Sequence, residues 1–283
     1  MDPRVISRFR RNRGALAGAA LVSFVLLLGL VGPWIAPHPP AKQFRTELLE
    51  QGLPVGPLER EGHLLGGDQL GRDQLSRLLH GARLSISIAL LATAIAVFIG
   101  VSVGLVSGYL GGFVDGALMR LVDIVLSLPF LLIAIVAQKS LDASGVLFIS
   151  TLLGVLSWTS LARITRAKTM QARALEYVEA ARALGFRGPR ILFRHVLPNV
   201  AGPAFAIGTL MVANMILAES ALSFLGFGLQ PPAASWGSML SESQTLMEWQ
   251  PTLTLFPALL IVITVFGFNL LGEGLRDVFD ARL

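Results

Sequence analysis

The stretch LSISIALLATAIAVFIGVSVGLVSGYLGGFV, which runs from Leu84 to Val114, contains no charged side chain. A hydrocarbon core of about 30 Å is crossed by a helix of about 20 apolar residues. The stretch is therefore long enough to cross a membrane, and it predicts an integral membrane protein. Its glycines Gly100, Gly104 and Gly108 recur every fourth position, a pattern that lets two membrane helices pack closely.

The composition of the whole chain supports a membrane protein. Of its 283 residues, 53% are hydrophobic and 14% are charged, whereas a soluble domain carries roughly a quarter charged residues. The chain has no cysteine, which excludes disulfides and thiolate metal sites. The net charge of +5 arises from arginines beside apolar runs, which indicates membrane orientation and not nucleic-acid binding.

Five apolar segments reach spanning length, and a sixth is shorter. The five are Gly14–Gln43 (with its helix ending near Ile35), Leu84–Val114, Ala143–Ala162, Val196–Ala218 and Pro251–Gly272. The sixth, Ile124–Gln138, spans if its helix begins near Ala117 and includes Arg120 and Asp123, which are spaced to pair on one helix face. Glycines and prolines in Ser220–Ser241 disfavour a continuous helix and favour an extracytoplasmic loop over or in the membrane. We predict an all-α membrane protein of about six transmembrane helices.

The placement of arginine predicts the orientation. The N-terminal segment and the loop Arg163–Arg194 are rich in arginine, whereas Phe227–Gln250 contains no Lys or Arg. Cytoplasmic loops are enriched in these residues, so both arginine-rich segments and both termini are expected in the cytoplasm. The exception is Pro37–Arg83, which falls outside although it carries arginines; its acidic residues roughly balance them. The first apolar run is longer than a signal-peptide core and lacks a cleavage site, so we expect a retained helix.

These expectations divide the chain into four parts. Residues 1–36 form the arginine-rich N-terminal segment and the first transmembrane helix, and residues 37–82 form an extracytoplasmic loop with an interfacial helix. Residues 83–272 contain five further helices and a cytoplasmic loop, residues 163–198. Residues 273–283 form a cytoplasmic tail.

The cytoplasmic loop carries the most informative pattern, ALEYVEAARALGFRGPRILFRHVLPNVAGP from Ala174 to Pro203. Good helix formers fill Leu175–Leu184, and its early acids suit the positive end of the helix dipole. Gly185 follows as a helix stop, Pro189 is placed to begin a second short helix, and Pro198 stands where the chain re-enters the membrane. We expect a compact cytoplasmic knob that a partner protein grips; by these residues alone, an ordinary solvated loop is the alternative.

The same loop resembles the "EAA" loop of bacterial ABC importer permeases. The residues that carry the resemblance are Glu179, Ala180, Ala181, Gly185, His195, Leu197 and Pro198. In that family the loop holds the coupling helix that seats in the ATPase subunit. The general pattern has isoleucine where this chain has His195, and FRHVLPN at Phe193–Asn199 is similar to the dipeptide/oligopeptide/nickel branch.

Three further segments resemble the second, C-type permease of that branch, in the same order along the chain: His63–Leu90, Ala218–Leu240 and Phe268–Leu283. The resemblance implies a type I ABC importer transmembrane domain in a bacterial cytoplasmic (inner) membrane. It also implies a homologous second permease, two ABC ATPase subunits and an extracytoplasmic substrate-binding protein as partners. The cargo would be di- or oligopeptides, and ATP would be hydrolysed by the separate subunits.

Several residue types bear on catalysis and cofactors. None of the three lysines follows a glycine, so the GxxxxGK[ST] phosphate loop is absent, and we expect no enzyme activity and no cofactor in this chain, with ATP and Mg²⁺ on partner subunits. The four histidines, His38, His63, His80 and His195, lack metal-ligand spacing, so no metal site is expected.

Two groups of charged residues allow two interpretations each. Glu219 is either a gate or pathway contact or a helix-packing carboxylate, and we favour packing. Arg72, Asp73 and Arg77 either bind substrate or form salt bridges on an interfacial helix, and we favour salt bridges.

Two rival functions remain. A nickel or other small-solute permease of the same family would fit, although we find no His, Met or carboxylate cluster on the membrane helices. An autonomous secondary transporter would usually show buried ionisable residues in mid-helix or paired broken helices, and we identify neither.

Overall fold

The computed structural model describes residues 9, 11–141 and 143–280. Four of its helices are long and apolar enough to cross a membrane: α2 (Arg13–Ile35), α4 (Gln74–Leu110), α11 (Leu197–Phe224, extended at its start by α10) and α13 (Thr252–Asp280). Two bent pairs bring the number of spans to six if each pair crosses once. The predicted count of about six is confirmed. Three of the N-terminal arginines used to predict the orientation, Arg4, Arg8 and Arg10, lie outside the described residues.

The bent pairs correct three sequence expectations. Helices α5 (Gly112–Ser127) and α6 (Phe130–Leu141) meet at 84°, so the predicted helix over Ile124–Gln138 is wrong. Pro129 disfavours helical geometry in the residue before it, and Leu128 is extended, with φ −87° and ψ 134°.

The second bent pair joins α7 (Val146–Ser157) to α8 (Thr159–Arg173) at 48°. The expectation that the chain lacks broken helices is therefore wrong as well. The predicted end at Ala162 is also too early, because α8 carries the helix on to Arg173. In the same way α4 begins at Gln74, so the expected interfacial helix is, from that residue, the first part of α4.

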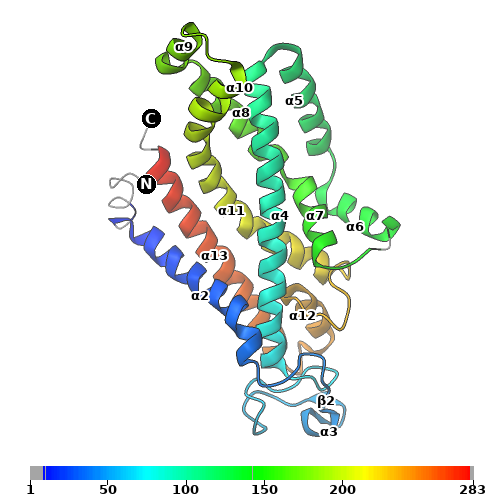
Figure 1. The fold of residues 1–283 in the computed structure, drawn as a ribbon. Coiled ribbons are helices and arrows are strands. Elements are labelled where there is room, and N and C mark those ends of the chain that lie inside the picture. The colour runs from blue at the N-terminus through cyan, green and yellow to red at the C-terminus, as the bar shows by residue number, and fades with distance from the viewer. Residues whose placement is uncertain (1–8, 10, 142, 281–283) are drawn as a thin grey trace.

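Helix α4 lies at the centre of the bundle, and α2, α7, α8 and α11 pack against it (Figure 1). Helix α13 packs against α2 and α11. The glycines of α4 let the backbone of α8 approach, as the sequence predicts. A Cβ added to Gly108 would lie 2.6 Å from the carbonyl oxygen of Arg166, and one added to Gly100 would lie 2.8 Å from that of Trp158.

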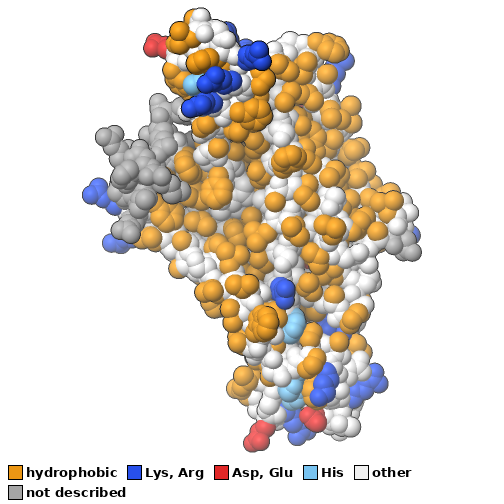
Figure 2. Space-filling view, in the orientation of Figure 1, with side chains coloured by type: hydrophobic (Ala, Val, Ile, Leu, Met, Phe, Trp, Pro, Cys, Tyr) orange, Lys and Arg blue, Asp and Glu red, His pale blue; other side chains and the backbone are white. Residues whose placement is uncertain are grey.

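Smaller elements occupy the two ends of the bundle. At one end lie α3 (Arg45–Leu48) and a hairpin of β1 (Leu49–Glu50) and β2 (Leu53–Pro54). At the other lie α9 (Glu176–Ala183) and α10 (Gly188–Ile191) (Figure 1). Figure 2 shows hydrophobic side chains covering the middle of the visible face, with charged side chains gathered at both ends. This distribution fits a bilayer around the middle of the bundle.

The predicted loop Ser220–Ser241 is partly helical. Helix α11 continues to Phe224, and after a turn the chain forms α12 (Trp236–Ser243), which packs against α11, α13 and α4. The side chain of Trp236 is fully buried, and its indole N–H donates to the carbonyl oxygen of Leu78 at 3.2 Å. The segment therefore closes the end of the bundle opposite to α9.

A buried ion-pair network joins the segment between α2 and α4 to α12. A guanidinium nitrogen of Arg72 lies 2.6 Å from Asp68 and another lies 2.6 Å from Glu242. The guanidinium of Arg77 lies 3.2 Å and 2.8 Å from the same two carboxylates. The predicted salt bridges of the two arginines are confirmed.

Near the opposite end, Asp123 of α5 pairs with Arg163 of α8, and not with Arg120. Asp115, also of α5, pairs with Arg166 of α8. Both ion pairs join the broken helix α5/α6 to α8.

Candidate coupling site and central cavity

The knob, residues 174–196, lies between α8 and α11. Helix α9 ends in a Schellman motif, in which the N–H of Phe186 donates to the carbonyl of Ala181 at 3.2 Å and that of Gly185 to Arg182 at 3.0 Å. The motif requires a left-handed residue at Gly185, whose φ is +80°. The sequence prediction of a helix ending at this glycine is confirmed.

The second part of the knob differs from the expectation. Pro189 stands in the first turn of α10, as predicted. However, α10 is not a separate helix, because a π-helical turn, Leu192–Val196, continues it directly into α11. Helices α10 and α11 are therefore joined without an intervening loop.

A small apolar core fixes the knob to the membrane helices. Val178 and Ala181 of α9 and Ile191 of α10 are buried against Leu105 of α4 and Val200 of α11. A further side chain, that of Ala172, joins the cluster from α8. This cluster packs the knob against α4, α8 and α11.

The outer face of the knob is exposed and partly apolar. Glu179 and Ala180 are exposed, whereas Ala181 of the same motif is buried. Leu184 is 75% exposed and Phe193 is 64% exposed. These two side chains are candidates for contact with a partner protein.

The remaining predicted residues of the loop, His195, Leu197 and Pro198, differ in their exposure. The ring of His195 stacks on that of Phe186, with centroids 6.3 Å apart and planes inclined by 12°. The guanidinium of Arg190 lies over the ring of Phe186, 4.7 Å from its centroid. Leu197 is half-buried, whereas Pro198 is exposed at the start of α11. His195 thus helps to build the knob, and Glu179, Ala180 and Gly185 contribute to its outer surface.

A cavity of about 590 Å³, here named the central cavity, lies between the two bent helix pairs and α11. Its lining is mostly apolar, with four polar side chains, those of Ser157, Thr159, Ser160 and Asn214. None of these four residues is among the site residues predicted from the sequence. The cavity exists because both helix pairs are bent. The sequence marks these bends only by Pro129 and by the change at Trp158 from an apolar segment to one with charged residues.

Glu219 is fully buried where α4, α11 and α12 meet. The hydroxyl of Ser223 donates to its carboxylate at 2.7 Å, and that of Ser85 does so at 3.5 Å. Ser85 in turn accepts from the backbone N–H of Trp236 at 3.1 Å. These contacts favour a helix-packing carboxylate, and Glu219 does not belong to the described lining of the central cavity.

Two family models match the chain. The model of the family described as "Binding-protein-dependent transport system inner membrane component" matches residues 96–283. The model described as "N-terminal TM domain of oligopeptide transport permease C" matches residues 4–52. The first match includes the knob, the central cavity and Glu219.

Curated relatives match over nearly the full length. The dipeptide transport system permease protein DppC of Escherichia coli (strain K12) is 43% identical over 282 residues, which cover 97% of this chain and 91% of that protein. The di/tripeptide transport system permease protein DppC of Pseudomonas aeruginosa (strain UCBPP-PA14) is 39% identical over 277 residues, with 97% and 90% covered.

A solved structure has the same fold. It is described as "Inward facing conformations of the MetNI methionine ABC transporter: CY5 native crystal form". The TM-score is 0.57 at 17% identity, and the match covers 71% of this chain and 96% of that one. The fold is therefore that of the transmembrane domain of an ABC importer.

Proposed function

The chain belongs to the family of binding-protein-dependent transport system inner membrane components and is a permease subunit of an ABC importer, and we propose that its cargo is di- or oligopeptides. The observation that carries the proposal is the identity of about 40% to permeases named for dipeptide and di/tripeptide transport. The central cavity supports it, because an apolar lining with few polar groups suits side chains of varied chemistry.

We propose that ATP is hydrolysed by two separate ABC ATPase subunits, which grip the outer face of the knob. Two features support this arrangement: the sequence lacks a phosphate-binding loop, and the knob exposes Glu179, Ala180 and Leu184. A homologous second permease and an extracytoplasmic substrate-binding protein would complete the importer.

The geometry suggests how force would be transmitted. When the ATPase subunits close on ATP, they would carry the knob with them. The continuous α10–α11 helix would then move together with α8, which contacts the knob through the buried Ala172. The helices that line the central cavity would then rotate from an inward-facing to an outward-facing state. ATP drives this change because it binds one of the two states more tightly.

We place both termini and the knob in the cytoplasm and the segment between α2 and α4 outside. The support is the arginine content of the loop after α8. The start of α2 and the end of α13 also lie towards the knob end of the bundle (Figure 1).

The first test is affinity purification of the chain from a mild detergent, followed by mass spectrometry. A second permease and P-loop ATPases are expected to co-purify. Recovery of the chain alone at every detergent strength would contradict the proposed assembly and return an autonomous secondary transporter to consideration.

The cargo is tested by reconstituting the purified importer, with its binding protein, into liposomes. We expect ATP-dependent uptake of labelled di- or tripeptides and no competition by Ni²⁺. Uptake of ⁶³Ni²⁺ without peptide uptake would identify the nickel permease that the sequence left open. Uptake driven by an ion gradient without ATP would overturn the importer mechanism.

A further inference from the structure

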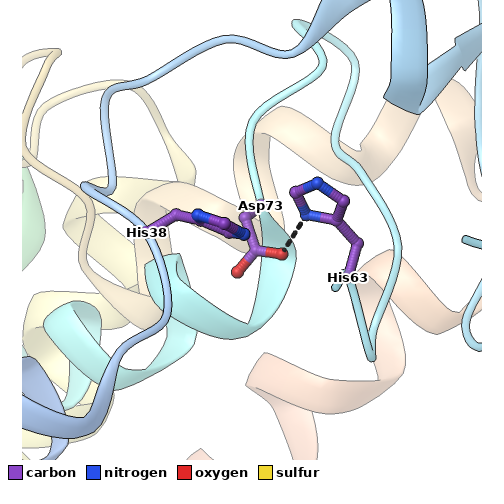
Figure 3. A group of neighbouring side chains, drawn as sticks. All are labelled: His38, His63 and Asp73. Carbon is purple, nitrogen blue, oxygen red and sulfur yellow. Dashed lines mark hydrogen bonds and ion pairs between the residues drawn. The ribbon is translucent and has the colours of Figure 1, made fainter. Parts of the chain in front are cut away.

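Two histidines and an aspartate converge on one point at the end of the bundle opposite to the knob. His38 follows α2, His63 lies in the loop after the β1–β2 hairpin, and Asp73 is the N-cap of α4. Figure 3 shows the three side chains directed towards one another. One potential ligand atom from each residue lies within 4.8 Å of the other two.

The cluster is largely buried and contacts its surroundings closely. His63 and Asp73 are buried, at 3% and 0% exposed, and Nδ1 of His63 lies 2.8 Å from Oδ1 of Asp73. The ring centroids of His38 and His63 are 4.7 Å apart, and the ring centroid of Phe44 lies 4.8 Å from each of them. The ring of Phe44 therefore covers one side of the three residues, whose nitrogen and oxygen atoms are potential metal ligands.

Neighbouring groups hold the donors in place. The other carboxylate oxygen of Asp73 accepts from the backbone N–H of Ser76 at 2.8 Å. Nε2 of His63 lies 3.6 Å from a carboxylate oxygen of Glu47. A histidine that binds a metal through one nitrogen usually donates the other N–H to a carboxylate, and Glu47 stands where that acceptor is needed.

We propose that His38, His63 and Asp73 bind a divalent transition-metal ion such as Zn²⁺, which ties the end of α2 and the following loop to the start of α4. Two imidazoles and a carboxylate are a common ligand set for Zn²⁺, and three protein ligands leave one position for water. The ligand bonds are about 2.0–2.2 Å long, which places tetrahedral donors about 3.3 Å apart. Nδ1 of His63 and Oδ1 of Asp73, now 2.8 Å apart, would separate slightly, and the donor of His38 would move inward from within 4.8 Å. The ion would lie between Nδ1 of His63 and Oδ1 of Asp73, and the proton of the neutral imidazole would be on Nε2, on the side of Glu47.

The sequence expectation of no metal site followed from spacing alone. The three residues come from different segments, so no local pattern such as HExxH marks them. The site also lies away from the central cavity, because none of the three residues belongs to its described lining. It would therefore stabilise the segment between α2 and α4, and it is independent of which cargo crosses the membrane.

The test uses the purified importer, stripped with a chelator, incubated with Zn²⁺ and desalted, and measures zinc by elemental analysis. We expect one more zinc ion per permease chain in the wild type than in His38→Gln or His63→Gln. His80→Gln is the matched control, because His80 lies on α4 outside the cluster, with Nδ1 2.9 Å from the carbonyl oxygen of Ser76. Equal zinc in the wild type and both cluster variants would overturn the proposal, as would a wild type that binds none.

A second measurement guards against loss of folding in the variants. Added Zn²⁺ should raise the thermal unfolding midpoint of the wild type and of His80→Gln, because a ligand that binds only the folded state stabilises it. The midpoint of His38→Gln, whose side chain is only half-buried, should not respond. A response of equal size in His38→Gln would count against the site even if peptide uptake is normal in every variant.

Discussion

Gly104 of α4 faces Thr165 of α8 so closely that a Cβ on this glycine would lie 2.5 Å from the Cβ of Thr165. The carbonyl oxygen of Ala162 would be 2.6 Å away, and a backbone atom cannot turn aside as a flexible side chain does. The contact joins the long central helix to the helix that leads into the knob.

Replacing Gly104 with alanine should therefore destabilise the protein. Forcing an extra carbon into a packed interface costs about 1–3 kcal/mol, which we expect as a lower unfolding midpoint in detergent. Gly116→Ala on α5 is the matched control, because no atom lies within 4 Å of its added Cβ. Equal midpoints for the two variants would show that α4 and α8 do not pack as described.

The ion-pair network at α12 predicts a second effect on stability. Glu242→Ala would leave Arg72 and the fully buried Arg77 to share Asp68. Removing one partner from a buried pair costs about 3–5 kcal/mol because it leaves an unpaired charge; the side chain of Glu242 is 22% exposed, so we expect about half of that.

The control for this prediction is Arg60→Ala, which removes an ion pair with Glu50 whose side chains are 45% and 66% exposed. Exposed pairs contribute about 0–1 kcal/mol, so this variant should unfold almost as the wild type does. Thermal unfolding of both variants in the same detergent measures the difference. A Glu242→Ala protein as stable as Arg60→Ala would mean that the network is not buried in solution.

Sequence reasoning succeeded where the chemistry is local. Gly185 ends a helix and Pro189 begins one because of properties that each residue has by itself, and the apolar runs are long enough to identify the spans. The bend at Pro129 also had a local signal, the bias of a residue before proline against helix. The predicted helix over Ile124–Gln138 rests on length and does not take this bias into account.

The features that sequence reasoning missed depend on contacts between distant segments. Nothing near Leu192–Val196 marks the π-turn that makes α10 continuous with α11. The approach of His38 to His63 is set by the packing of the loops between α2 and α4, and the central cavity follows from two bends and their placement against α11. Such features follow from tertiary packing, which local propensity does not determine.

Orientation predicts a third result, which the absence of cysteine makes easy to test. Glu61→Cys lies in the exposed loop after the hairpin, and Leu184→Cys lies on the knob. In intact spheroplasts that lack the ATPase subunits, a membrane-impermeant maleimide should label the first cysteine and not the second. After permeabilisation both should react. Labelling of Leu184→Cys in intact spheroplasts would invert the proposed topology.

The knob allows a sharper test, because Gly185 combines a left-handed backbone with open space. Its φ is +80° and an added Cβ would meet no atom within 4 Å, so a substitution acts on the backbone and not by collision. A β-branched residue tolerates this conformation poorly, whereas asparagine adopts it more readily. Gly185→Val should therefore distort the turn after α9, at a cost of about 1–2 kcal/mol, and Gly185→Asn should not.

We expect Gly185→Val to insert normally in the membrane but to reduce ATP-driven peptide uptake about tenfold, the factor that corresponds to about 1.4 kcal/mol. Glu179→Lys should uncouple ATP hydrolysis from uptake in the same way, since it reverses an exposed charge on the face that we propose the ATPase subunits bind. The measurement compares ATPase activity with peptide uptake in liposomes. Wild-type uptake by both Gly185→Val and Glu179→Lys would show that the knob does not couple the ATPases to this permease.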